Sequence, residues 1–187
     1  MEAHTAAGKL QGLREDALWY EAAHVVGITN ALNVVADGLS GVGRLFSAVE
    51  EGSASAEVKA VYAEIRAFYD RREVPVAFRL LGHDAGYLAE FWGAVRHAFT
   101  DNRLSRRLKE ALAFAVSLTS RSPFGTAFHL EEMRRLGVGE RGVLEVLGVT
   151  QVFSSYTKIA DTLQLESDMG ELAPVDSTPA PGGKHSA

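Results

Sequence analysis

The sequence predicts an all-α protein, and three observations support that prediction. Leu, Ala, Glu and Arg dominate the 187 residues, and these residue types favour helix. Apolar residues recur at helical spacing, as in Leu18, Ala22 and Val25. Alternating β-branched runs, which indicate strands, do not occur. The chain also has no cysteine, so disulfides, thiolate nucleophiles and zinc–thiolate sites are excluded.

The predicted helices are separated by glycines, prolines and capping residues. Gly38 and Gly41 end the first helix, and Asp84 is placed to cap a later one. The sharpest boundary is Ser122-Pro123, because serine is a good N-cap and proline a good first helical residue. Helices are therefore expected over residues 13–36, 42–49, 56–69, 76–81, 85–99, 104–118, 123–136 and 140–165.

The pattern divides the chain into three regions. Residues 1–53 form an N-terminal helical segment, and residues 54–166 form the core. Residues 167–187 are rich in Pro, Gly and small polar residues, and a stretch of that composition predicts a disordered tail.

Composition narrows the possible partners and locations. The formal net charge is -5, and both basic clusters, Arg103 to Lys109 and Arg134-Arg135, have acidic neighbours. Nucleic acid is therefore not expected as a partner. No apolar run approaches the roughly 20 residues of a membrane span. The start of the chain shows no secretory signal, so we expect a cytoplasmic protein with no membrane partner.

A hairpin of two helices around Ser122 brings two chemically active residue types together. Glu110 and His129 lie at depths of roughly 13 Å and 10 Å from the turn, at about 1.5 Å per residue. If the helices pack antiparallel, the two side chains can face each other and form a proton relay. Ser122, Gly125 and His129 share one helix face because they are spaced three and four residues apart.

Two segments carry a resemblance to a known family. These are Arg107-Leu108-Lys109-Glu110-Ala111-Leu112-Ala113-Phe114-Ala115-Val116-Ser117 and Ser122-Pro123-Phe124-Gly125-Thr126-Ala127-Phe128-His129. They resemble the core motif of the alkylhydroperoxidase D-like (AhpD-like) proteins, which include the carboxymuconolactone decarboxylases. The resemblance covers about residues 56–166 and implies an AhpD-like helical bundle.

The resemblance also implies candidate site residues. In the thiol-dependent members a Glu is followed, twelve positions later, by Cys-x-x-Cys and then a His. Glu110, Ser122, Gly125 and His129 match this spacing. Glu110, His129 and Ser122 are thus the catalytic candidates of a degenerate site, with Gly125 at the attacking-cysteine position. The chain resembles a peroxidase-related branch that lacks Cys-x-x-Cys.

The missing cysteines exclude the thiol mechanism that the resemblance implies. Glycine has no side chain, and a serine hydroxyl does not cycle through a sulfenic state. The decarboxylase members commonly carry Glu where Gly125 stands, so their pattern is not met either. Whether the chain is an enzyme at all is therefore open.

Four hypotheses remain from the sequence. The chain is a degenerate oligomeric module, or an acid–base enzyme using Glu110 and His129 on a small organic acid or lactone. A third hypothesis makes Ser122 a hydrolase nucleophile. A fourth places a metal among His83, His97, His129 and Glu110, although no ligand spacing supports it. We expect no cofactor and no metal. A small organic acid or a hydroperoxide-like molecule is the candidate ligand.

A homo-oligomer is expected from the apolar pattern. The predicted helices over residues 91–99 and 143–163 carry apolar residues on more than one face, which suggests a partner helix. The residues that show this are Trp92, Val95, Phe99, Val149, Val152, Phe153 and Tyr156. The AhpD-like resemblance implies oligomers as well.

Overall fold

The structure, a computed structural model, describes residues 16–39 and 46–165. In these residues the chain is helical and forms no strand, so the predicted all-α class is confirmed. The tail predicted over residues 167–187 lies outside the described residues. None of the described helices has the length and apolar character needed to cross a membrane.

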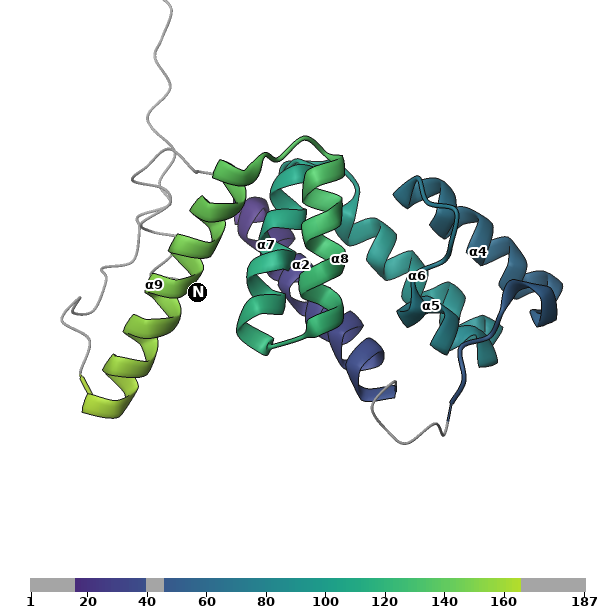
Figure 1. Cartoon of the computed structure of the whole chain (residues 1–187), viewed down its shortest axis with the longest axis horizontal. Coiled ribbons are helices and arrows are strands. Elements are labelled where there is room, and N and C mark those ends of the chain that lie inside the picture. Colours follow the sequence, from purple (N-terminus) through teal and green to yellow (C-terminus); the bar gives the residue numbers. More distant parts are fainter. Residues whose placement is uncertain (1–15, 40–45, 166–187) are drawn as a thin grey trace, which may run out of the picture.

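The described elements are all helices or single helical turns (Figure 1). The helix α2, Asp16–Asn33, continues into a π-helical turn, Val34–Gly38. The other elements are the 3-10 turn Glu51–Ser53, α4 Ala56–Tyr69, α5 Val76–Leu80, the 3-10 turn Leu81–His83, α6 Ala85–Phe99, α7 Arg106–Ser120, α8 Pro123–Arg135 and α9 Glu140–Leu163.

Side-chain caps explain why several helices start where the sequence predicts. Ser55 accepts a hydrogen bond from the backbone N–H of Val58 at the start of α4. Asp84 accepts one from Tyr87 at 2.9 Å at the start of α6. Both caps satisfy N–H groups that have no partner inside the helix.

The short helix predicted over residues 42–49 is wrong in its described part. Phe46 to Val49 are not helical, and residues 40–45 are not described. The backbone N–H of Val49 donates to the carbonyl of Arg79 at 3.0 Å. The Val49 carbonyl accepts from the Tyr62 hydroxyl at 3.0 Å. These long-range bonds satisfy the backbone in a non-helical conformation, which a local pattern does not reveal.

The helices pack around the hairpin of α7 and α8. In Figure 1, α2 crosses this hairpin, α4 and α6 lie to one side and α9 to the other. The apolar residues of α6 that suggested a partner helix are buried in the chain's own core. Trp92 is 2% exposed, and Val95 and Phe99 are fully buried. The α9 residues of the same prediction remain exposed.

Helix α2 shares the core of the later helices. Val25 and Leu32 of α2 and Ala36 of the following π-helical turn are at most 1% exposed and belong to the main hydrophobic cluster. The Lys109 ammonium of α7 is buried, pairs with Glu21 of α2 and donates to a backbone carbonyl, that of Thr100. Apolar burial and a buried ion pair therefore hold α2 against α7.

Candidate functional site

The hairpin turn is held by local backbone chemistry. Arg121 ends α7 in the left-handed region, with φ 57°. Ser122 is the N-cap of α8, and its Oγ accepts from the backbone N–H of Gly125 at 2.9 Å. Pro123 occupies the first turn of α8. The predicted helix boundary at Ser122-Pro123 is therefore present, and the Ser122 hydroxyl is engaged as a cap.

The turn brings Glu110 and His129 face to face across the hairpin. Glu110 Oε2 lies 2.8 Å from His129 Nδ1, and both side chains are fully buried. A carboxylate can only accept a hydrogen bond, so His129 donates to Glu110 through its Nδ1–H. The residues that the sequence analysis paired are thus adjacent in the fold.

Aromatic side chains enclose the imidazole of His129. The ring stacks on Phe99 with centroids 5.6 Å apart and meets the edge of Phe128 at 5.1 Å. Phe128 in turn stacks on Phe124 at 5.4 Å. These rings keep the imidazole away from water and fix its orientation.

A buried charge network lies beside the pair. The guanidinium of Arg106 has its Nε 3.6 Å from Glu110 Oε1, and it also binds Glu132 at 3.2 Å. Glu132 is fully buried and receives further hydrogen bonds from Arg71 and Arg135. Three guanidinium groups thus neutralise this carboxylate, as a buried charge requires.

Tyr69 adds a hydroxyl close to these charges. Burial raises the pKa of the Tyr69 hydroxyl well above its usual range, and the Glu110 carboxylate raises it further. The Arg106 guanidinium lies 5.2 Å from the centre of the Tyr69 ring and acts in the opposite direction on that pKa. The phenol therefore stays neutral at ordinary pH.

Both side chains of the Glu110–His129 pair are fully buried among the described residues. His129 Nε2 and Glu110 Oε1 are buried and have no hydrogen-bond partner among the described residues. The surface hollows of about 200–260 Å³ are lined by other residues. So is the groove of about 800 Å³ between α7 and α9. The arrangement is a sealed acid–base pair.

The space beside Gly125 is filled from α2. A Cβ added at Gly125 would lie 2.9 Å from Asn33 Cγ and closer still to Asn33 Oδ1 and Ser117 Oγ. Real Cβ atoms essentially never approach other atoms within 3.0 Å. The Asn33 amide donates to Ser117 at 3.1 Å and to Ser120 at 3.2 Å. The carboxamide is therefore held in the place of a side chain at position 125.

Asn33 did not emerge from the sequence analysis. Thr29 and Asn33, four residues apart on α2, are both at least 96% buried, on the same helix as the buried Val25 and Leu32. In the sequence, two polar residues one helical turn apart among apolar neighbours indicate a polar contact inside the protein. This pattern does not indicate which helix Thr29 and Asn33 face.

The proposed metal ligands do not come together. His83 lies against the backbone carbonyl of Ser47, at 2.7 Å from its Nε2. His97 lies beside His24, with ring centroids 5.5 Å apart. Within the described ranges, no three His, Asp or Glu side chains are grouped as a metal site would need. The hypothesis of a metal among His83, His97, His129 and Glu110 is therefore wrong for this arrangement.

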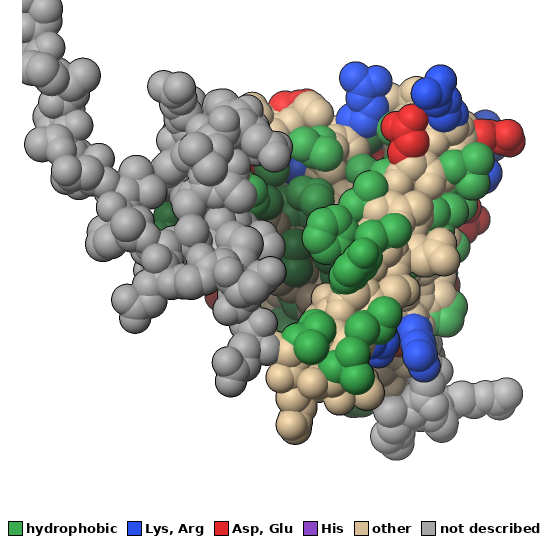
Figure 2. Space-filling view, turned by 90° about the vertical axis from the view of Figure 1, so that its left-hand side faces the viewer, with side chains coloured by type: hydrophobic (Ala, Val, Ile, Leu, Met, Phe, Trp, Pro, Cys, Tyr) green, Lys and Arg blue, Asp and Glu red, His purple; other side chains and the backbone are tan. Residues whose placement is uncertain are grey.

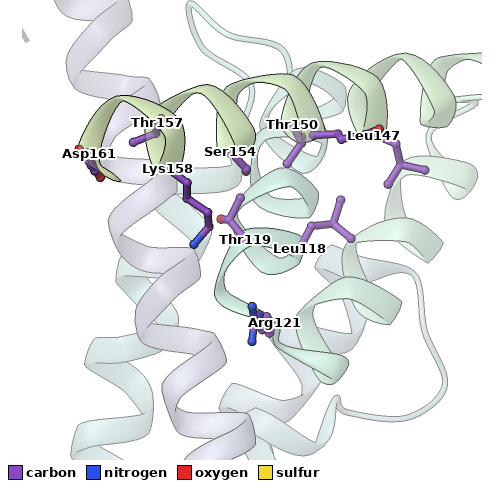
Figure 3. A pocket seen from close by; sticks show the side chains of 10 residues that line it. Leu118, Thr119, Arg121, Leu147, Thr150, Ser154, Thr157, Lys158 and Asp161 are labelled. Atoms are coloured by element: carbon purple, nitrogen blue, oxygen red, sulfur yellow. The ribbon is translucent and has the colours of Figure 1, made fainter. Parts of the chain in front are cut away.

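The groove between α7 and α9 is a separate feature. Figure 3 shows Leu118, Thr119 and Arg121 at the end of α7 opposite Thr150 and Lys158 of α9. Most of its lining residues are Thr, Ser or charged residues, Leu118 and Leu147 are apolar, and the carbon atoms of all of them contribute to its surface. The groove lies outside the Glu110–His129 pair and shares no lining residue with it.

Comparison with solved structures gives the class of fold. The chain is similar to the crystal structure of the alkylhydroperoxidase AhpD core from Rhodospirillum rubrum, with a TM-score of 0.63 and 23% identity. The match covers 67% of this chain and 95% of that chain. The chain therefore has the AhpD-like fold, as its sequence predicts.

A family match supports the resemblance. Residues 85–165 match the model of the carboxymuconolactone decarboxylase family. This range contains Glu110, Ser122, Gly125 and His129 and begins later than the predicted resemblance from residue 56. The resemblance to the AhpD-like and carboxymuconolactone decarboxylase family is confirmed over these residues. Among curated proteins no significant match is found.

Proposed function

We propose that the chain is a degenerate AhpD-like module that catalyses neither peroxide reduction nor acid–base chemistry. It keeps the fold and the Glu110–His129 pair as structure and works as a homo-oligomeric interaction module in the cytoplasm. The observation that carries the proposal is the filled space beside Gly125. With Asn33 held there by two serines, a side chain at position 125 has no room, and His129, one helical turn further along α8, is itself fully buried.

The burial of the pair supports a structural role. Glu110 and His129 satisfy each other, and Phe99, Phe128 and Arg106 surround them. A buried carboxylate beside a guanidinium and an imidazole joins α7 to α8 and specifies how the hairpin packs. Ser122 has a structural task as well, because its hydroxyl caps α8.

An acid–base enzyme is the second candidate. It is favoured by the 2.8 Å contact between Glu110 and His129, which orients the imidazole with a free Nε2. Such a base would act on a small organic acid or lactone. The substrate would have to reach Nε2 by displacing Asn33 or the aromatic rings.

Two assays separate these functions. With cumene hydroperoxide and dithiothreitol, turnover should equal that of a no-protein control, because the chain has no thiol. With carboxymuconolactone, carbon dioxide release should also stay at the control rate. Release that Glu110→Gln or His129→Ala abolishes, while the exposed Glu145→Gln leaves it intact, would replace the proposal by the acid–base enzyme.

A further inference from the structure

Helix α9 turns its polar face toward its own protein. Ser154, Thr157 and Lys158 line the groove beside α7 (Figure 3). On the opposite side of the helix, Val152 and Tyr156 are 50% and 69% exposed, within a diagonal band of hydrophobic side chains (Figure 2). A helix that packs only within its own chain has the reverse arrangement. The polar face of α9 therefore borders a space of about 800 Å³ and not a packed core.

The groove between α7 and α9 changes character along its length. Leu118 and Leu147 lie toward one end, and Arg121 and Lys158 lie toward the other (Figure 3). Leu147 and Lys158 are separated by about 16 Å along the helix axis, at about 1.5 Å per residue. The groove therefore fits an elongated molecule that has one apolar end and one charged end.

Three threonines between these ends offer carbon atoms more than hydrogen-bond donors. The hydroxyls of Thr150 and Thr157 each donate to a backbone carbonyl of α9, at 2.7 and 2.8 Å. The hydroxyl of Thr119 donates to a carbonyl of α7 at 2.9 Å. A hydroxyl has one hydrogen to donate, so these three cannot also donate to a ligand. Their methyl groups remain as a surface for a carbon chain.

The charged end of the groove favours an anion. No ion pair joins Arg121 or Lys158 to a carboxylate of the described residues. The backbone of Arg121 is fixed in the left-handed region at the end of α7. Asp161 is the acidic residue of the lining, so cations outnumber anions by two to one. A guanidinium and an ammonium together match a carboxylate or a phosphate group.

We propose that the groove between α7 and α9 binds a small amphipathic anion, in which one anionic head group is carried on a short apolar chain. The head group lies at Arg121 and Lys158, and the chain runs over the threonine methyl groups toward Leu118 and Leu147. Carboxylates and phosphate monoesters share this chemistry. The site has no residue in common with the buried acid–base pair and does not depend on the proposed function.

Binding in this groove should stabilise α9. None of the 24 residues of α9 is buried in the single chain. Most helices in proteins depend on tertiary packing, and a ligand that contacts both α7 and α9 supplies part of it. Amide hydrogen exchange of α9 should therefore slow when the ligand is added.

The first test is calorimetric titration of the full chain with octanoate and with octyl phosphate, each below its micelle concentration. At least one of the two should bind saturably, with one site per chain, and the tighter one identifies the head group. Acetate and inorganic phosphate lack the chain, and octanol lacks the charge. Each of these three should bind at least about ten-fold more weakly.

Charge variants locate the head group. Arg121→Gln and Lys158→Gln should each weaken binding of the octyl ligand by roughly two- to five-fold, as expected for exposed charges. Asp161→Asn should tighten binding, because it removes a like charge from the groove. Arg141→Gln removes a cation from the same helix outside the groove, with 94% of its side chain exposed, and should leave the Kd unchanged.

Apolar variants locate the chain. Leu147→Ser should weaken binding of the octyl ligand and leave the weak binding of acetate unchanged. Leu144→Ser is the control, since Leu144 is 66% exposed on the same helix and does not line the groove.

Several outcomes would overturn this proposal. One is the absence of saturable binding of both octyl ligands. Another is a Kd that the combined Arg121→Gln and Lys158→Gln changes leave as it was, because the ligand would then lie elsewhere. Acetate or phosphate binding as tight as that of the octyl ligands would exclude the apolar half of the site. The peroxide and decarboxylation assays above concern the buried pair, so their results leave this proposal unaffected.

Discussion

The carboxamide of Asn33 occupies the space between α8 and α2 that a side chain at Gly125 would need. The added Cβ would lie 2.9 Å from Asn33 Cγ, and Asn33 is held there by Ser117 and Ser120. Gly125, which has no side chain, is therefore the residue that allows α2 to pack where it does.

Gly125→Ala should consequently destabilise the protein by about 1–3 kcal/mol, as overpacking of a core does. Gly93 is the matched control, since it lies in α6 with nothing within 4 Å of an added Cβ. Gly93→Ala should stabilise by roughly 0.5–1 kcal/mol, the usual gain for a helical glycine.

A double-mutant cycle tests whether Asn33 causes that loss. In an Asn33→Ala background the cost of Gly125→Ala should fall by at least half, measured by urea unfolding. Adding Ser117→Ala should remove the remaining close contact. If Gly125→Ala costs the same in every background, the two residues do not compete for this space.

The buried carboxylate of Glu132 should contribute far more to the free energy of unfolding than the exposed carboxylate of Glu131. Glu132→Gln leaves three guanidiniums around a neutral amide and should cost about 3–5 kcal/mol, as for a broken buried ion pair. Glu131→Gln removes an exposed partner of Arg71, with 62% of its side chain exposed, and should cost under about 1 kcal/mol. Equal losses in denaturant midpoint for the two variants would contradict the network.

The pair between Glu21 and Lys109 should make stability depend on acidic pH. Burial raises the pKa of the Glu21 carboxyl, but the hydrogen bond and charge of Lys109 and the backbone N–H groups of Arg103 and Leu104 together outweigh burial, so the folded pKa lies below the usual 4.5. This pair therefore stabilises the folded protein above pH 4.5. The stabilisation is lost as the pH falls through the pKa that Glu21 has in the folded protein.

Unfolding curves measured between pH 3 and 7 check this dependence. Glu21→Gln should flatten the acid side of the stability profile and lower stability at neutral pH. Glu145→Gln, which changes an exposed carboxylate with 68% of its side chain accessible, is the control and should keep the wild-type profile. Identical profiles for all three proteins would contradict the prediction.

Ser122 should behave as a helix cap. Ser122→Ala should cost about 1 kcal/mol, the usual loss for an N-cap, and Ser122→Asp should recover most of it. Ser55→Ala, at the cap of α4, should cost a similar amount. Hydrolysis of p-nitrophenyl acetate above a no-protein control, lost in both Ser122 variants, would support a nucleophile instead.

Much of the hairpin could be predicted from the sequence, because it depends on local rules. The Ser122-Pro123 boundary follows from capping and from the fixed geometry of proline. The meeting of Glu110 and His129 follows from helical rise and an antiparallel turn. Each step uses only residues close together in the chain or on one hairpin.

The features that could not be predicted from the sequence depend on contacts between segments that are far apart in the chain. The non-helical run from Phe46 to Val49 is set by bonds from Val49 to Arg79 and Tyr62. The contact between Asn33 and Gly125 depends on where α2 crosses α8. The apolar stripe of α9 is visible in the sequence, but its outward direction is a property of the packed molecule.

The contact between Asn33 and Gly125 also limits how the site can change over generations. A cysteine at position 125 would need the space that Asn33 fills. Replacing Asn33 first would remove the amide that bonds Ser117 and Ser120. Either substitution alone should lower stability, so a side chain at position 125 requires a compensating change at position 33. A helix outside residues 85–165 therefore restricts which side chains position 125 can carry.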